Sequence, residues 1–255
     1  MNFTKGLLRW ILTENKPLVG LNKMVKIKQG DFIQVSFTLR VKDTNRIIET
    51  TDEKVAIKAN IFDEKSNYGP RLMIVGNEEM FLKRLNKAVI GKEIGEKFKV
   101  AIPPEETFGQ RDSAKIKMLG RKELVAKNII PEVGKQIQWG NQTGIIISAA
   151  GGRVRVDFNH PLVGQTIEYN VEILEKINGV KKKIEALIDY RLPGVDLKDF
   201  AILDEKVKVT ITIPQEIISK DPYIQFRKMR IASDINTNIP DRKEIVFIDS
   251  FTFEG

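Results

Sequence analysis

Stretches that alternate between apolar and polar residues recur along this chain, and they limit it to a fold built on half-buried β-strands. The longest covers residues 31–41 (DFIQVSFTLRV), and similar stretches cover residues 96–102 (EKFKVAI) and 165–173 (QTIEYNVEI). A period of two residues places successive side chains on opposite faces of a sheet, so one face meets a core and the other meets solvent. These three segments are the expected framework of the fold.

The segments between these strands follow other patterns. Apolar residues at helical spacing predict a helix at Glu79–Val89, and Gly, Asn and Pro mark the turns between short strands. Short strands are expected at residues 46–51, 71–75, 134–139, 143–148 and 153–158, and one or two turns of helix at 122–127.

The pattern changes after residue 179. Strands are predicted at residues 181–189, 206–213 and 245–253, and mainly helix at residues 217–234. In that helix Tyr223, Phe226, Met229 and Ala232 recur every three positions. Ile224 and Ile231 lie off that face. This last part of the chain is expected to form a small α+β domain.

The composition excludes several chemistries. The chain has no cysteine, which excludes disulfides, thiolate metal sites and a cysteine nucleophile. Its single histidine, His160, excludes a multi-histidine metal site and is expected to stabilise a turn. The absence of cysteine fits a reducing compartment, and a cytoplasmic location is expected. No apolar run approaches the ~20 residues that span a bilayer.

Residues 1–24 form the only candidate targeting segment. Their apolar cluster is interrupted by Arg9 and followed by Glu14. A signal peptide needs an unbroken apolar stretch and small residues at a cleavage site. An amphipathic arm, or an older start at Met24, is therefore favoured over a signal peptide.

Positive charge is concentrated in the middle of the chain. The formal net charge is +8, and residues 109–156 contain nine basic and three acidic residues. Such a surface can contact RNA or attract acidic chains. Because no aromatic-interleaved RNA motif accompanies it, a solvated lysine-rich surface is favoured, and a weak contact with the ribosome or RNA stays open.

Three local motifs follow one another in an order that resembles FKBP-type peptidyl-prolyl isomerases. Ile94-Gly95-Glu96 precedes an alternating strand, which leads into residues 103–109 (PPEETFG). Residues 156–164 (VDFNHPLVG) then run into residues 166–173 (TIEYNVEI). The combination is similar to the SlyD type of this family, and in particular to its long archaeal form with an additional C-terminal domain.

The resemblance implies an α+β fold in which a strongly bent antiparallel sheet wraps on a short helix and carries a small β-rich flap domain in one loop. The implied parts are an N-terminal extension at residues 1–24, an FKBP-like isomerase domain at 25–111 and 157–178, an inserted flap (chaperone) domain at 112–156, and a C-terminal α+β domain at 180–255.

The implied activity, prolyl isomerisation, needs little from the protein in the way of reactive groups. Rotation about an X–Pro bond breaks no covalent bond, and its barrier of ~18–20 kcal/mol comes from lost amide resonance. A dry apolar cup that favours the twisted amide is sufficient, without a nucleophile, metal or cofactor. The cup residues that the resemblance implies are Leu39, Ile48, Glu49, Phe81, Leu82, Leu85, Phe108 and Tyr169, with Met73 facing the same cup. Without the family, the apolar members of this set would be expected in a core and Glu49 on the surface.

The cup departs from the family pattern at several positions. Family members commonly have Tyr at the position of Leu39, Phe-Asp at Ile48-Glu49, and Pro-Gly at Lys83-Arg84. The change removes two aromatic rings that stack on proline, and Glu in place of Asp moves a carboxylate by one methylene. The departures leave a weakened isomerase activity open. The alternative is a non-catalytic chaperone, or a ribosome-associated binding module, with a degenerate cup.

The flap is expected to hold unfolded or nascent polypeptides that contain proline. Exposed apolar surface beside a charged border can bind such chains without self-association. Its expected apolar contacts are Ile137, Trp139, Ile145 and Ile147, and its expected basic rim consists of Lys115, Lys117, Arg121, Lys122, Lys127, Lys135, Arg153 and Arg155. Bacterial relatives often carry a His- and Cys-rich tail that binds nickel. The end of this chain lacks such residues, so no metal is expected, nor a cofactor or membrane partner.

Overall fold

The structure of the protein, a computed structural model, describes residues 26–251. The expected N-terminal extension at residues 1–24 lies outside the described residues. The chain divides into two compact units, and each is described by itself. Unit 1 contains the described residues up to Thr38, Glu49–Lys99 and the chain from Asn170 onward, whereas unit 2 contains Leu39–Ile48 and Val100–Tyr169.

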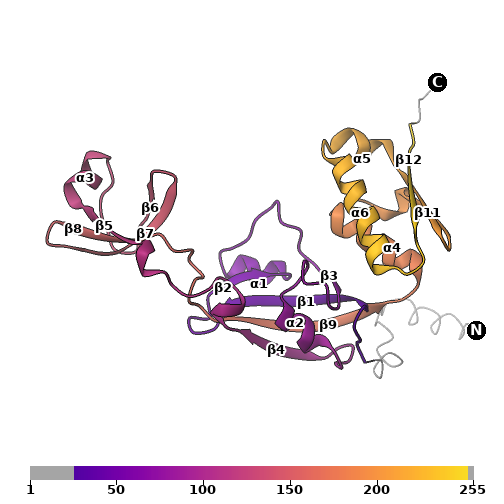
Figure 1. The fold of residues 1–255 in the computed structure, drawn as a ribbon, viewed down its shortest axis with the longest axis horizontal. Coiled ribbons are helices and arrows are strands. Elements are labelled where there is room, and N and C mark those ends of the chain that lie inside the picture. Colours follow the sequence, from indigo (N-terminus) through magenta and orange to yellow (C-terminus); the bar gives the residue numbers. More distant parts are fainter. Residues whose placement is uncertain (1–25, 252–255) are drawn as a thin grey trace, which may run out of the picture. The chain divides into compact units, whose positions relative to one another are not determined.

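The three alternating segments form β1, β4 and β9 of a five-stranded sheet, as their period of two predicts (Figure 1). Its strand order is β2-β1-β9-β4, and β3 pairs antiparallel with β1, so that Phe32 lies opposite Ile74. Along β1, Val35 and Phe37 are buried, whereas the polar residues between and beyond them are half-buried. The strands are β1 (Phe32–Val41), β2 (Ile47–Thr50), β3 (Arg71–Ile74), β4 (Lys97–Ile102) and β9 (Ile167–Ile177).

Two short helices and one 3₁₀ turn accompany this sheet. Helix α1 (Glu53–Lys58) begins after Asp52, whose side chain accepts hydrogen bonds from the backbone N–H groups of Lys54 and Val55. Helix α2 (Lys83–Val89) is shorter than the predicted 79–89, because Leu82 has an extended backbone and the residues before it form a turn. The 3₁₀ turn η1 covers Pro104–Glu106.

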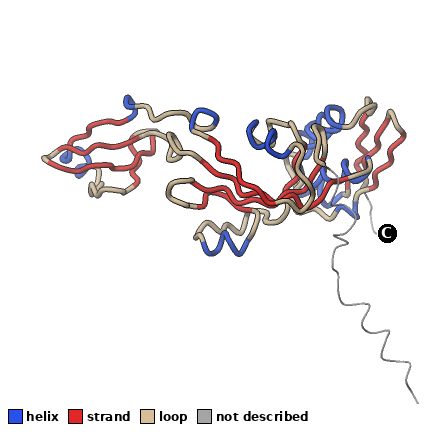
Figure 2. Tube along the Cα trace, turned by 90° about the horizontal axis from the view of Figure 1, so that it is seen from below, coloured by secondary structure: helices blue, strands red, loops and turns tan. Residues whose placement is uncertain are grey.

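The flap is a four-stranded antiparallel sheet in the order β5-β8-β7-β6. Its own small core contains Leu124, Ile137, Ile146, Val154 and Val156. Figure 2 shows that strands dominate this part of the chain. The elements are η2 (Ser113–Lys115), β5 (Ile116–Gly120), α3 (Arg121–Ala126), β6 (Gln136–Trp139), β7 (Gln142–Ala150) and β8 (Arg153–Asp157).

The C-terminal part combines helices with a three-stranded sheet, as the predicted α+β composition requires. Strand β10 is antiparallel to β11, and β12 is parallel to it. The elements are α4 (Val180–Arg191), η3 (Leu197–Asp199), β10 (Ala201–Glu205), β11 (Lys208–Ile213), α5 (Gln215–Lys220), α6 (Ile224–Asn238) and β12 (Glu244–Asp249).

The strand predicted at residues 181–189 is wrong, because this segment lies inside helix α4. Its buried residues Ile184, Leu187 and Ile188 follow the i, i+3, i+4 spacing of a helix face. The Lys, Glu, Ala and Leu residues around them also favour a helix. Four apolar residues in nine positions do not define a period when taken alone, and the long-range core decided between helix and strand.

The helix predicted at 217–234 is present as α5 and α6, but its apolar stripe of Tyr223, Phe226 and Met229 is exposed. The buried face of α6 carries Ile224, Ile231 and Ile235. Ile224 and Ile231 are the two residues that lie off the stripe in the sequence pattern.

Within unit 1 the C-terminal part shares one core with the end of the five-stranded sheet. Phe32 of β1 and Leu72 and Ile74 of β3 belong to the same buried cluster as Leu187 of α4 and Ile211 of β11. A contiguous core of this kind couples the two parts mechanically, since packed interiors transmit displacement. None of the helices in residues 26–251 is long and apolar enough to cross a membrane.

Candidate active site

Helix α2 and the segment before it carry three of the expected cup residues in unit 1. Leu85 is 1% exposed, whereas Phe81 and Leu82 are half-buried. The ring of Phe81 meets Phe37 of β1 edge to face, with centroids 5.8 Å apart and planes at 86°. Met73 of β3 is fully buried. This stretch therefore presents two partly accessible apolar side chains supported by a buried aromatic ring.

A buried asparagine, Asn86, organises this stretch. Its Nδ2 donates to the carbonyl oxygens of Phe81 (2.7 Å), Asn77 (3.2 Å) and Leu82 (3.4 Å). Its Oδ1 accepts a hydrogen bond from the backbone N–H of Gly76 at 2.7 Å. These bonds fix the backbone that carries Phe81. Sequence reasoning missed Asn86, although a lone amide one position past Leu85 on an otherwise apolar helix face was a usable signal.

Of the remaining expected cup residues, four lie on β-strands and one follows η1. Leu39 of β1 and Tyr169 of β9 are buried and belong to neighbouring strands. Ile48 of β2 is half-buried, and the adjacent Glu49 is exposed. Phe108, which follows η1, is 43% exposed. Glu49 belongs to unit 1, and Leu39, Ile48, Phe108 and Tyr169 belong to unit 2.

Two of the sequence motifs meet within unit 2. The backbone N–H of Gly164 donates to the carbonyl oxygen of Gly109 at 2.9 Å, which joins the segment PPEETFG to the segment VDFNHPLVG. Beside this bond the ring of Phe108 stacks on His160, with centroids 4.6 Å apart and planes at 8°. His160 also accepts a hydrogen bond from the backbone N–H of Leu162 at 3.2 Å, the turn-stabilising role expected for it.

The base of the flap is closed by polar contacts next to these motifs. Asn159 donates to the carbonyl oxygen of Asp112 at 2.9 Å and accepts from its N–H at 3.0 Å. Arg111 forms an ion pair with the buried Asp157. The segment that enters the flap and the segment that leaves it are thus bonded to each other.

Comparison with known proteins now decides the family. The family model described as FKBP-type peptidyl-prolyl cis-trans isomerase matches residues 23–127. The short-type peptidyl-prolyl cis-trans isomerase of Methanocaldococcus jannaschii is 33% identical over 147 residues, which are 58% of this chain and 92% of that relative. The chain belongs to the FKBP-type peptidyl-prolyl cis-trans isomerase family.

Two further family models match later parts of the chain. The model described as FKBP26, IF domain matches residues 117–162, and the model described as FKBP26_C-terminal matches residues 180–252. The FKBP-type 16 kDa isomerase of Escherichia coli is 27% identical over 154 residues, 58% of this chain and 93% of that relative. The SlyD isomerase of Treponema pallidum is 26% identical over 168 residues, 64% of this chain and 86% of that relative. The expected FKBP fold with an insert and a C-terminal domain is thus confirmed.

The flap of this FKBP member places its expected apolar contacts differently from the sequence-based prediction. Ile137 is 4% exposed and belongs to the flap core, so it does not form a surface contact. Trp139 and Ile145 are half-buried, and Lys127 lies over the Trp139 ring at 4.2 Å. Ile147 is half-buried where the register of β7 against β8 shifts. The large apolar residues that are exposed in the flap are Met118, Val125, Ile130 and Val133.

The alternation of β7 could not identify these exposed residues. Met118 is on the edge strand β5, Val125 is on α3, and Ile130 and Val133 follow that helix. The eight expected rim residues, by contrast, are all exposed. Within residues 26–251 no group of three or more His, Asp or Glu residues could hold a metal ion.

Proposed function

We propose that this protein isomerises X–Pro bonds in unfolded or nascent polypeptides and that its flap holds those polypeptides. The observation that carries the first part is the match across 92% of the archaeal isomerase. The family model spans residues 23–127, which contain every expected cup residue except Tyr169. The family activity requires only an apolar surface that lowers the cost of twisting the amide.

The half-buried side chains support a binding role for Phe81 and Leu82. Each offers apolar area to a prolyl ring, and Asn86 keeps the backbone beneath them in place. Phe37 backs the Phe81 ring, which limits its rotation. A preorganised apolar surface adds binding energy without an ordering cost at the moment of binding. Leu39 and Tyr169, by contrast, are buried and offer little surface to a substrate.

The flap surface supports the holding role. Four large apolar side chains are each more than half exposed and lie outside the flap core: Met118, Val125, Ile130 and Val133. Exposed apolar side chains among eight exposed cations suit a site that binds unfolded chains and stays monomeric. The same cations support a second proposal, a weak contact with the ribosome or RNA. Sedimentation with ribosomes at low and high salt would test it.

A peptide assay tests catalysis. The full chain should accelerate isomerisation of a proline tetrapeptide, and Phe81→Ala should lower kcat/KM by about tenfold, the effect of losing roughly 1.4 kcal/mol of binding to the twisted amide. Ile57→Ala, an exposed residue of α1 outside the cup, is the matched control. A folded wild-type chain with no activity would support the non-catalytic chaperone, the alternative that the missing aromatics at Leu39 and Ile48 favour.

A protein client tests holding. Replacing residues 112–156 by a short linker should leave tetrapeptide activity nearly intact, slow refolding of a proline-limited client, and abolish suppression of its aggregation. The sharper variant changes Met118, Val125, Ile130 and Val133 together to Ser, which keeps the flap core. If that variant protects the client as well as the wild type does, these residues are not the holding surface. The cytoplasmic location expected from the sequence stays a prediction, which cell fractionation would test.

A further inference from the structure

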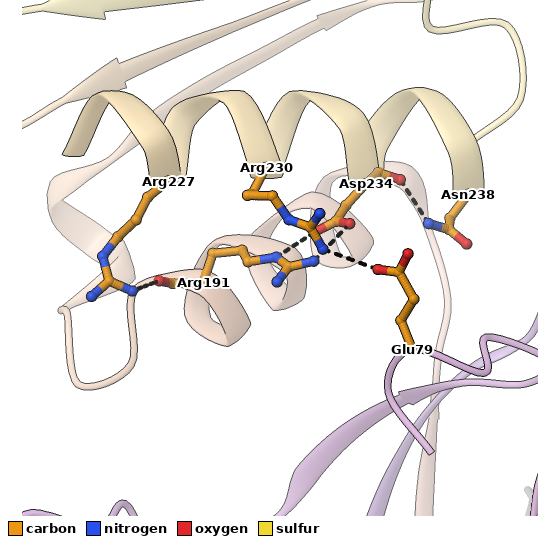
Figure 3. A network of polar contacts seen from close by, with 6 residues as sticks. All are labelled: Glu79, Arg191, Arg227, Arg230, Asp234 and Asn238. Atoms are coloured by element: carbon orange, nitrogen blue, oxygen red, sulfur yellow. Dashed lines mark hydrogen bonds and ion pairs between the residues drawn. The ribbon is translucent and has the colours of Figure 1, made fainter. Parts of the chain in front are cut away.

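The turn between β3 and α2 connects the isomerase segment to the C-terminal part of unit 1. It carries Glu79, Met80 and Phe81 in succession. Arg230 of α6 donates through Nη2 to the Glu79 carboxylate at 3.0 Å (Figure 3). Met80 packs against the buried cluster that contains Ile231 and Leu187. Phe81, which contacts the Phe37 ring, thus follows directly after a residue bound to α6 and a residue packed on the core that the two parts share.

The inner side of the same turn is anchored within the isomerase segment. The backbone N–H groups of Met80 and Phe81 both donate to the carbonyl oxygen of Asn77 at 3.3 Å, and the N–H of Glu79 donates to its side chain at 2.9 Å. Asn86 binds the carbonyl oxygen of Phe81 at 2.7 Å. Because Met80 and Phe81 donate to the same carbonyl oxygen, a displacement of Glu79 or Met80 can be passed on to Phe81.

Arg230 projects from a helix that is itself firmly held. Arg191 of α4 donates from Nε and Nη2 to the Asp234 carboxylate at 2.6 and 3.0 Å, and this pair is largely buried (Figure 3). The hydrogen bond to Asp234 raises the pKa of Arg191. Arg227 donates to the carbonyl oxygen of Arg191 at 2.6 Å. Helix α6, which carries Arg230, is therefore held against Arg191 of α4 by several hydrogen bonds.

A polar cavity of about 420 Å³ adjoins the ion pair and is lined by Glu79 and Arg230, together with Gln29, Asn77 and Glu78 of the isomerase segment and Ser233, Thr237 and Asn238 of α6. The hydrogen bond from Arg230 thus joins α6 to the turn beside the apolar core that β3 shares with the C-terminal part. The Arg230 and Glu79 side chains are 36% and 74% exposed, so their ion pair adds little to global stability. Such a contact can still set the position of the turn.

We propose that the C-terminal domain positions Phe81 and Leu82 for binding of the prolyl ring, with Arg230 as a positioning residue that acts through Glu79. This inference rests on the proposed isomerase function. A shift of about 1 Å in a binding group can change catalytic efficiency far more than it changes stability. Because Phe81 and Leu82 would contact the proline in the ground state and the twisted state alike, loss of their positioning raises KM and leaves kcat unchanged.

A double-mutant cycle in the full chain tests the proposal. With a proline tetrapeptide as substrate, Arg230→Ala and Glu79→Ala should each raise KM by about 3- to 10-fold, and the double variant should be no worse than either. Arg230→Lys, which keeps the charge, should restore most of the loss. The matched control is Arg242→Ala, which removes a pair with Asp204 in the same domain, held at 3.0 and 2.7 Å. Its KM should equal that of the wild type.

The outcomes separate cleanly. Effects that add in the double variant, an equal rise in KM for Arg242→Ala, or an unchanged KM for Arg230→Ala with an active wild type each refute the positioning role and leave the proposed function intact. An inactive, folded wild type refutes the proposed function, and the positioning role with it.

Discussion

The imidazole of His160 lies flat against the ring of Phe108, at a centroid separation of 4.6 Å and an interplanar angle of 8°. The two residues are 52 positions apart, on either side of the flap insertion. The stack therefore holds the chain entering the flap against the chain leaving it, next to the hydrogen bond between Gly109 and Gly164. It also covers one face of an otherwise exposed aromatic ring.

Replacing His160 by Ala should expose that face of Phe108. Stacked aromatic pairs contribute about 0.5–1.5 kcal/mol beyond their buried area, so a loss of about 1 kcal/mol in the free energy of unfolding is expected. Urea denaturation measures it. His160→Phe keeps a flat partner and should retain most of the stability. If the two variants are equally stable, stacking contributes nothing measurable.

Asn86→Ala should destabilise the protein and loosen the turn that carries Phe81. The change leaves the Gly76 N–H and the carbonyl oxygen of Phe81 without their partner, and each buried unsatisfied group costs about 1–3 kcal/mol. Denaturation and tetrapeptide assays should both respond. Lys87→Ala, an exposed change on the same helix, serves as the control and should alter neither. A stable Asn86→Ala protein with normal KM would show that the turn keeps its shape without the side chain.

Gly144→Ala should weaken the flap alone. A Cβ atom at Gly144 would lie 2.6 Å from Cγ1 of Val156 and 2.8 Å from Cδ1 of Phe158, too close without movement of the core. Overpacking of this kind costs about 1–3 kcal/mol. Trp139 fluorescence should report earlier unfolding of the flap, with tetrapeptide activity unchanged. At Gly120 an added Cβ meets nothing closer than 3.8 Å, so Gly120→Ala should behave as the wild type.

The Asp204–Arg242 pair should make stability depend on pH on the acid side. The hydrogen bond from Arg242 lowers the pKa of Asp204 below its ordinary value of 3.8. The unfolded chain therefore binds the proton first, and the contribution of the pair is fully present above pH 3.8 and is lost as pH falls through the lowered pKa. The difference in unfolding free energy between wild type and Asp204→Asn should accordingly shrink from pH 6 to pH 2. A difference independent of pH would mean that the carboxylate charge is not involved.

Local sequence was sufficient for the strands of the isomerase sheet and for the family. Most of β1 and β9 has one buried side and one half-buried side, so apolar and polar residues alternate along the sequence. The turn motifs around Gly109 and Gly164 are local as well, because positive φ angles at these residues favour glycine. Their order along the chain identified the family before any contact between them was known.

Tertiary structure decided whatever depends on residues distant in sequence. Residues 181–189 form a helix because Ile184, Leu187 and Ile188 face a core built from other elements. Ile137 is buried because strands β7 and β8 and helix α3 close over it. Helix α6 exposes its apolar stripe because its isoleucines belong to the buried core of the C-terminal part. The Arg230–Glu79 contact spans 151 positions. No local period encodes such a pairing, since it exists only when two separately specified surfaces pack together.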